Sequence, residues 1–239
     1  MAGDGAAGAY VCQLTITSDG LTLAPGGPAS AFVTPAARAY AAPAAAMAVA
    51  IGGMAPKAVK RLPLITGHPP FTVKGAGKGK PALDRAEYLR QLTGQQDSLN
   101  RLTVAEFLTN RDAYNNRKKT QPDGRDPQGN KFQELERQKA QARKVRELRQ
   151  QNTSLSKKQA EDQADAWLRT QAALHDPDQV AGGYADRMTG VGDARTNSAI
   201  GAAWPKRIKG IDKQVRSHAS TMTSDEQATT YLDILLPIR

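Results

Sequence analysis

The distribution of apolar and polar residues predicts helices over most of the chain beyond residue 81. The clearest apolar stripe starts at Thr103, which is followed three positions later by Glu106 in the arrangement of a capping box. Ser156 and Gln159 form a second candidate capping box, ahead of a helix that we expect to continue to about His175. The helices expected are residues 82–93, a helix from 103, residues 132–150, residues 156–175 and a last helix through residue 215.

Composition divides the chain at about residue 66. Residues 1–66 are rich in Ala, Gly and Pro, poor in charge, and contain one short strand-like stretch at residues 10–17. The small residues of 44–54 suit either a helix that docks closely on a partner or a membrane surface, or a disordered segment. We therefore expect a low-complexity N-terminal segment, 1–66, partly disordered and with at most a short strand. A compact all-α domain is expected over residues 67–239, because no pair of long strands is evident in residues 82–239.

Composition and charge limit the function classes. The 239 residues include one cysteine, Cys12, which excludes an intrachain disulfide framework and a Cys-rich zinc module. The chain has no run of 18 apolar residues and no basic-then-apolar N-terminus, so neither a stable membrane span nor a secretory signal is expected. The net charge is +10, and most of the basic excess lies in residues 67–170. This excess suits binding to a polyanion, or equally a set of solvated helix faces.

One arginine interrupts an apolar stripe. Arg111 lies on the same helical face as the apolar residues that follow Thr103. A charge on a buried face is costly unless it is paired. Arg111 is therefore held by a carboxylate, is directed into a site, or extends its head group out to water.

The strongest candidate chemistry lies in residues 174–183. Proline is tolerated in the first turn of a helix but not in its interior, so we expect one helix to end near His175, Asp176 to cap the next and Pro177 to begin it. His175 and Asp178 then flank a rigid junction. An imidazole can transfer a proton near neutral pH, and a carboxylate can orient it or bind a divalent cation. On spacing alone, a buried histidine with a structural role is the default interpretation.

Several separated stretches, taken together, resemble the polymorphic toxin type 15 (novel toxin 15) family over residues of about 67–213. They are residues 91–104, Arg111, Tyr114, 173–183, Gly192-Asp193 and 197–204, in that order. The H-x-x-D motif of that family corresponds to His175 and Asp178 in this chain. The resemblance implies a DNA-degrading nuclease toxin (a DNase) that requires a divalent metal, usually magnesium, and is commonly delivered by a type VI secretion system. It also implies a cognate immunity protein that protects the producer.

The resemblance suggests a role for each matching residue. We expect His175 to act as a general base or metal ligand, Asp178 to bind magnesium or orient His175, and Asp193 to be a further metal ligand or simply a turn residue. The residues expected to line or support the site, unless they are structural, are Gln96, Asn100, Arg111 on the scissile phosphate, Tyr114, Asn197 and Ser198. Two departures from the family pattern stand out. The cysteine that many relatives carry near the domain start is absent, and Pro205 after Trp204 leaves the path of the last helix open.

The expected partners are a DNA substrate, the immunity protein, and a secretion chaperone or carrier that binds residues 1–66. The toxin is expected to be secreted into the target-cell cytoplasm, and to be held in the producer's cytoplasm by its immunity protein. Two alternative functions remain. A non-enzymatic basic helical module would retain DNA in a salt-sensitive way without breaking it. A toxin with another substrate would act on RNA or on a nucleotide cofactor.

Overall fold

The computed structural model of the chain describes residues 15–17, 20–22, 59–75 and 79–239. The chain divides into two compact units, Met1–Ala55 and Pro56–Arg239. In the first unit, β1 (Thr15–Thr17) and β2 (Gly20–Thr22) form an antiparallel pair, so a short strand is present at the end of the expected stretch 10–17. The small-residue segment 44–54 lies outside the described residues.

The second unit is mostly helical, as expected, but it also contains a two-stranded antiparallel hairpin, so the all-α expectation is corrected to this extent. In chain order its elements are α1 (Arg85–Leu99), α2 (Val104–Arg117), α3 (Gly129–Gln151), α4 (Lys157–Leu168), β3 (Gln171–His175), the 3₁₀ helix η2 (Gln179–Ala181), β4 (Met188–Asp193), α5 (Ala194–Ala203), α6 (Pro205–Ala219) and α7 (Ser224–Thr229).

Local capping signals set several helix starts. The Thr103 hydroxyl accepts a hydrogen bond from the Glu106 backbone N–H at 3.2 Å, and the Glu106 carboxylate accepts one from the Thr103 N–H at 2.8 Å. The capping box of Ser156 and Gln159 at the start of α4 is also confirmed. Such a cap contributes about 1 kcal/mol to stability. Pro205 occupies the first turn of α6, where its missing N–H costs nothing, so the proline starts this helix directly after α5.

The helix expected to reach His175 ends earlier, at Leu168, and this prediction was wrong. The Arg137 side chain, from α3, donates hydrogen bonds to the Leu168 carbonyl at 3.2 Å and to the Gln171 carbonyl at 2.6 Å. The following residues pair with β4, with Gln171 opposite Asp193. A distant side chain and a distant strand thus override the helical preference of the Gln-Ala-Ala-Leu sequence in β3.

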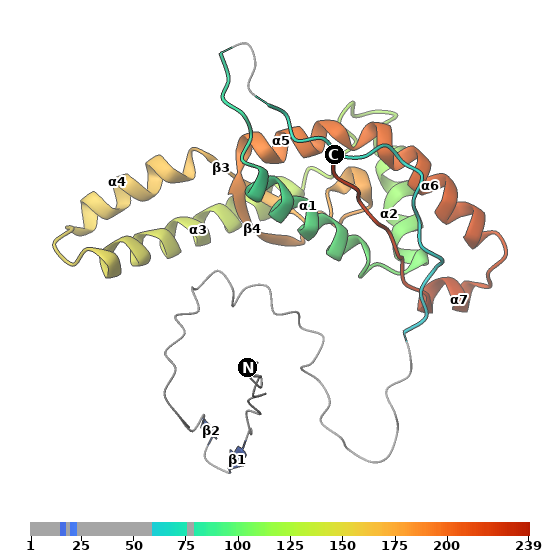
Figure 1. The fold of residues 1–239 in the computed structure, drawn as a ribbon, viewed down its shortest axis with the longest axis horizontal. Coiled ribbons are helices and arrows are strands. Elements are labelled where there is room, and N and C mark those ends of the chain that lie inside the picture. The colour runs from blue at the N-terminus through green and yellow to red at the C-terminus, as the bar shows by residue number, and fades with distance from the viewer. Residues whose placement is uncertain (1–14, 18–19, 23–58, 76–78) are drawn as a thin grey trace, which may run out of the picture. The chain divides into compact units, whose positions relative to one another are not determined.

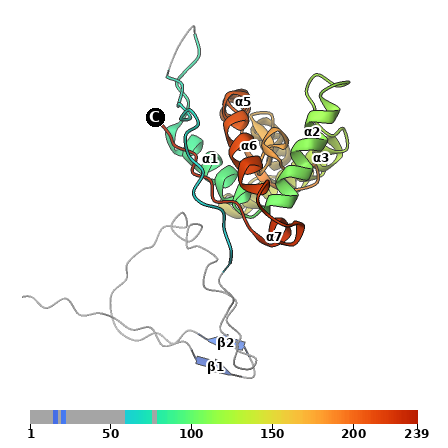
Figure 2. The same ribbon diagram turned by 90° about the vertical axis from the view of Figure 1, so that its right-hand side faces the viewer.

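The core of the second unit lies among α1, α2, α5 and α6, and Figure 2 shows α5 and α6 between α1 and α2. Trp204, at the α5–α6 junction, is fully buried and packs edge-on against Phe71, with ring centroids 5.2 Å apart. Within the described part of the chain, no helix is both long enough and apolar enough to cross a membrane.

Two extended segments, residues 59–71 and 231–238, run parallel to each other beside these helices. Bridges pair Arg61 with Tyr231, Ile65 with Ile234 and Phe71 with Ile238. Leu62 and Ile65, which the composition assigns to the N-terminal segment, are buried in the core of the second unit. A variant that removes the N-terminal segment alone should therefore end its deletion at Ala55 and not at residue 66.

Helices α3 and α4 form an antiparallel pair that extends to the left of the other helices in Figure 1. Ala140 on α3 and Ala160 and Ala164 on α4 are buried, and Gln141 on α3 donates a hydrogen bond to Asp165 on α4. The N-terminal half of α3 lies next to β3, so this pair of helices contributes one wall of the site described next.

Candidate active site

The H-x-x-D stretch forms a tight junction between β3 and η2. The Asp176–Pro177 peptide bond is cis, and Asp178 caps η2 by accepting a hydrogen bond from the Val180 N–H at 3.2 Å. A Cβ atom on Gly183 would lie 1.8 Å from the Pro177 carbonyl oxygen, so only glycine fits there. The expectation that Asp176 caps a helix beginning at Pro177 was wrong, because the cap lies two residues later, at Asp178.

His175 and Asp178 line one cavity of about 300 Å³. Strand β3, the η2 cap, helices α3 and α5 and the loop before α3 form its walls. The lining residues are Arg125, Gln133, Arg137, Gln171, Ala172, Ala173, His175, Asp178 and Asn197. The junction therefore brings the two residues of the motif to one small volume.

The hydrogen bonds of His175 determine which ring nitrogen is basic. Its Nε2 lies 3.2 Å from the Ala185 carbonyl oxygen, and its Nδ1 lies 3.4 Å from the amide nitrogen of Gln133. Nε2 also lies 3.3 Å from the Gln179 amide nitrogen, but its shorter contact is to the Ala185 carbonyl oxygen, which only accepts, so we place the proton on Nε2 and the lone pair on Nδ1, toward Gln133. Burial lowers the pKa of the imidazole, with a further contribution from Arg125, while Ala185 and Asp178 oppose the shift. The ring is therefore neutral at pH 7 and able to accept a proton.

Arg125, from the loop before α3, neutralises the Asp178 carboxylate. Its Nη2 lies 3.1 Å from Oδ1 and 3.0 Å from Oδ2 of Asp178. Asp178 is buried, but the Arg125 side chain is 41% exposed, so the guanidinium can reach an anion that enters from solvent. This pair places a cation and a carboxylate in the same cavity as the neutral imidazole.

Gln95, on α1, holds the junction together, and the sequence did not predict this role. Its side-chain amide donates to the His175 carbonyl and to the Asp176 carboxylate, both at 2.8 Å, and its Oε1 accepts from the Asp178 N–H at 2.7 Å. The signal available in the sequence was a glutamine at helical spacing from the apolar residues Leu92 and Leu99. All three side chains are buried on one face of α1.

Asp176 supports the junction from its buried side. Its carboxylate accepts hydrogen bonds from Gln95 and from the Thr189 hydroxyl on β4. Burial raises the pKa of Asp176, and the hydrogen bonds oppose this shift. Asp176 does not line the cavity, so its role is to fix the backbone between His175 and Asp178.

Helix α3 starts directly against the site. A Cβ atom on Gly129 would lie 2.8 Å from the Gln179 amide nitrogen and 3.4 Å from His175 Nε2. Gln179 in turn accepts a hydrogen bond from the Asp126 N–H at 2.8 Å. The absence of a side chain at Gly129 thus lets α3 approach closely enough for Gln133 to contact the imidazole.

The structure places the other predicted residues at different locations. Asn197 lines the cavity. Gln96 and Asn100 bind the backbone of the C-terminal segment, at Leu236 and Ile234 respectively. Asp193 caps α5, with its Oδ1 accepting from the Thr196 N–H at 2.8 Å and the Thr196 hydroxyl at 2.7 Å. Ser198 is exposed and lines a separate hollow, and Arg111 and Tyr114 line a cavity between α2 and α6.

The donor set suits a metal with few protein ligands. In residues 59–75 and 79–239, no group of three or more His, Cys, Asp or Glu side chains is arranged to hold a metal ion. Asp178 supplies the one carboxylate that lines the cavity, and its Oδ2 has a single hydrogen-bond donor, Arg125. Magnesium keeps several waters and can be bound through one or two carboxylates and a substrate phosphate. Asp178 alone could supply one such ligand, in place of part of its contact with Arg125.

The sequence model of one protein family, described as Novel toxin 15, matches residues 82–236. The match covers about two thirds of the chain and includes every residue that lines the cavity. None of the curated proteins compared with the chain matches it.

Proposed function

The chain belongs to the novel toxin 15 family of polymorphic toxin domains, and we propose that this domain is a nuclease that hydrolyses phosphodiester bonds in the DNA of a target cell. The observation that carries the proposal is a neutral imidazole and an Arg–carboxylate pair that line one cavity, at the H-x-x-D stretch of the domain. Phosphodiester hydrolysis needs a base for the attacking water and positive charge on the phosphate.

Each side chain has a role in this proposal. His175 Nδ1 accepts the proton of the attacking water, while the Nε2 bond to Ala185 fixes the ring. Arg125 exchanges part of its contact with Asp178 for a contact with the scissile phosphate, and Asn197 offers an amide to the substrate. Arg111 is left out of this step, because it lines a different cavity.

Asp178 would hold the magnesium ion that the family resemblance implies. When bound, the ion supplies positive charge that stabilises the charge developing on the phosphate. We do not assign it to Asp193, because the carboxylate of Asp193 caps α5. The chain's own contribution is to keep Asp178 fixed through the Gln95 and Val180 hydrogen bonds.

Delivery and protection complete the proposal. A type VI secretion system would carry the toxin into the target-cell cytoplasm, with the N-terminal segment binding a chaperone or carrier. In the producer, an immunity protein would hold the toxin inactive in the cytoplasm. Membership of a polymorphic toxin family supports delivery to target cells and an immunity partner, and the type VI route and the chaperone come from the resemblance described above.

The test compares cleavage of supercoiled plasmid by purified wild-type protein and by two variants, with magnesium and with chelator. His175→Ala and Asp178→Asn should lose nearly all cleavage, and chelator should abolish cleavage by the wild type. The matched controls are His218→Ala on α6 and Asp186→Asn in the β3–β4 connection, neither of which lines the cavity. Wild-type cleavage by a folded His175→Ala protein would refute the site.

A further inference from the structure

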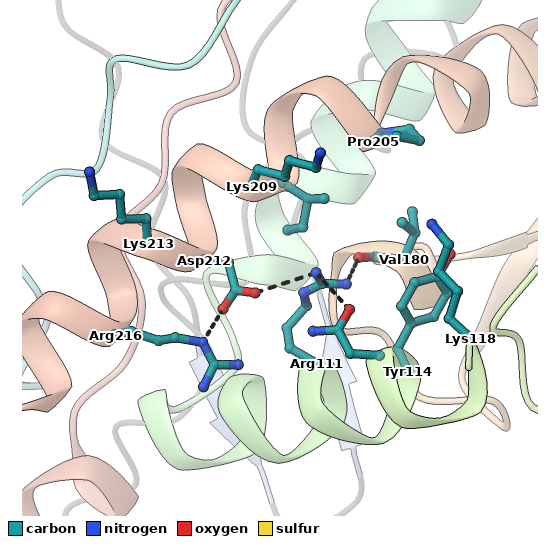
Figure 3. Close-up of a pocket in the computed structure, with 11 residues that line it drawn as sticks. Arg111, Tyr114, Lys118, Val180, Pro205, Lys209, Asp212, Lys213 and Arg216 are labelled. Carbon is teal, nitrogen blue, oxygen red and sulfur yellow. Dashed lines mark hydrogen bonds and ion pairs between the residues drawn. The ribbon is translucent and has the colours of Figure 1, made fainter.

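A second cavity, of about 480 Å³, lies between α2 and α6 and shares no lining residue with the candidate active site. Figure 3 shows Arg111 of α2 facing Asp212 of α6, with the Lys209 and Lys213 side chains extending outward from α6. Eleven residues line it: Arg111, Tyr114, Asn115, Lys118, Val180, Pro205, Ile208, Lys209, Asp212, Lys213 and Arg216. Five of these are basic and one is acidic, so the cavity favours an anionic ligand.

The single carboxylate of this cavity is already neutralised. Asp212 Oδ1 lies 2.9 Å from Arg216 Nε, and its Oδ2 lies 3.4 Å from Arg111 Nη2 (dashed lines in Figure 3). Arg216 also contacts Asp112 at 2.5 Å. Across the described ranges of the chain, Lys118, Lys209 and Lys213 make no ion pair or side-chain hydrogen bond. All three lysines line the cavity.

Arg111 forms the inner wall of this cavity and is itself incompletely satisfied. It is 4% exposed, donates from Nη1 to the Val180 carbonyl at 2.5 Å, and has a buried Nε without a hydrogen-bond partner. Burying a guanidinium N–H without a partner costs free energy, which an incoming anion would recover. The unpartnered Nε of Arg111 is thus an observation independent of the three lysines.

The two cavities adjoin η2 on different sides. Asp178, the cap of η2, lines the candidate active site, and Val180, two residues later, lines the α2–α6 cavity. The two cavities are therefore neighbours at η2, and a substrate with several phosphates would have to extend beyond the first cavity to reach the lysines of the second.

We propose that the α2–α6 cavity binds a backbone phosphate of the nucleic acid substrate, away from the bond that is cut. This inference rests on the proposed nuclease function, and it assigns Lys118, Lys209 and Lys213 to substrate affinity and not to bond cleavage. Contacts of this kind carry no base information, so they raise affinity for any sequence.

The experiment uses Lys209→Gln/Lys213→Gln and, as a control with the same change in charge, Lys157→Gln/Lys158→Gln at the start of α4. The first measurement is the Kd for a short fluorescent DNA duplex in the presence of chelator, over a range of salt concentrations. If each lysine neutralises one phosphate, the slope of log K against log[salt] falls by about 1.8, and affinity at about 0.15 M salt falls on the order of 30-fold. The control should change affinity far less.

The second measurement is hydrolysis of bis(p-nitrophenyl) phosphate, which carries one phosphate and cannot occupy both cavities. The Lys209→Gln/Lys213→Gln protein should hydrolyse it at the wild-type rate while cutting plasmid more slowly. Equal losses of duplex affinity in both double variants would overturn the inference, because the effect would then be general charge. Unchanged duplex affinity of the Lys209→Gln/Lys213→Gln protein would also overturn it. A wild-type protein that hydrolyses neither substrate but binds DNA through these lysines would refute the nuclease proposal and leave the phosphate site supported.

Discussion

Replacing Gln95 by leucine should destabilise the junction that carries His175 and Asp178. Leucine has a similar size but makes none of the three hydrogen bonds of the glutamine side chain. The change leaves the His175 carbonyl, the Asp178 N–H and one oxygen of Asp176 without this partner, in a region where all four residues are buried. Each of the three unsatisfied buried groups costs about 1–3 kcal/mol, so the loss in unfolding free energy should total roughly 3–9 kcal/mol.

The assay is urea-induced unfolding of the full chain, followed by circular dichroism. The control is Gln163→Leu, at an exposed position of α4, which should change the unfolding free energy by less than about 0.5 kcal/mol. Plasmid cleavage should also fall under conditions where Gln95→Leu is still folded. The reason is that the Asp178 N–H loses its hydrogen bond to Gln95 Oε1, which fixes the Asp178 backbone. A loss below about 1 kcal/mol with normal cleavage would refute the assigned role of Gln95.

Three further predictions follow from the site and the fold. Burial lowers the pKa of His175 in the folded protein, so the acid limb of kcat/KM against pH should have its midpoint below 6.5. The unfolding free energy should fall as pH drops from the ordinary histidine pKa to the lower pKa of the folded protein. A kinetic midpoint above 6.5 would contradict a buried base. Gly183→Ala should lower the thermal midpoint strongly because of the contact with Pro177, whereas Gly75→Ala, whose Cβ meets nothing within 4 Å, should leave it unchanged in the same melting experiment. Deleting residues 1–55 should preserve plasmid cleavage in vitro and abolish delivery in a competition assay. Deleting residues 1–66 also removes Leu62 and Ile65 and should lower the unfolding free energy by roughly 3–6 kcal/mol. Equal stability of the two deletion proteins would argue against the packing of residues 59–66.

The capping-box predictions, which depend only on residues close together in the sequence, were confirmed. The capping boxes at Thr103 and Ser156 depend on residues three positions apart, and both are present. The end of α4 depends instead on Arg137, more than thirty residues away, and on pairing with β4. Helical periodicity reflects neither contact, so the sequence predicts a helix through the residues that form β3.

In the candidate site, too, tertiary contacts decide the roles of single residues that look equivalent in the sequence. Gln95 and Gln96 have the same side chain and both follow the apolar Leu92 at helical spacing, yet Gln95 contacts the junction and Gln96 contacts the C-terminal segment. Which face of α1 meets η2 is a property of tertiary packing. Arg125 lies in a loop without periodicity, so no pattern in the sequence marks it as the partner of Asp178.

The parallel course of residues 59–71 and 231–238 bears on how the second unit would resist mechanical unfolding. Backbone hydrogen bonds join the two segments along this course, from Lys60 and Tyr231 to Phe71 and Arg239. A pull on both ends of the unit would draw the segments past each other and load these bonds in shear, all at once. Any machine that threads this protein through a narrow channel would have to overcome that clamp before the helices could be drawn out one by one.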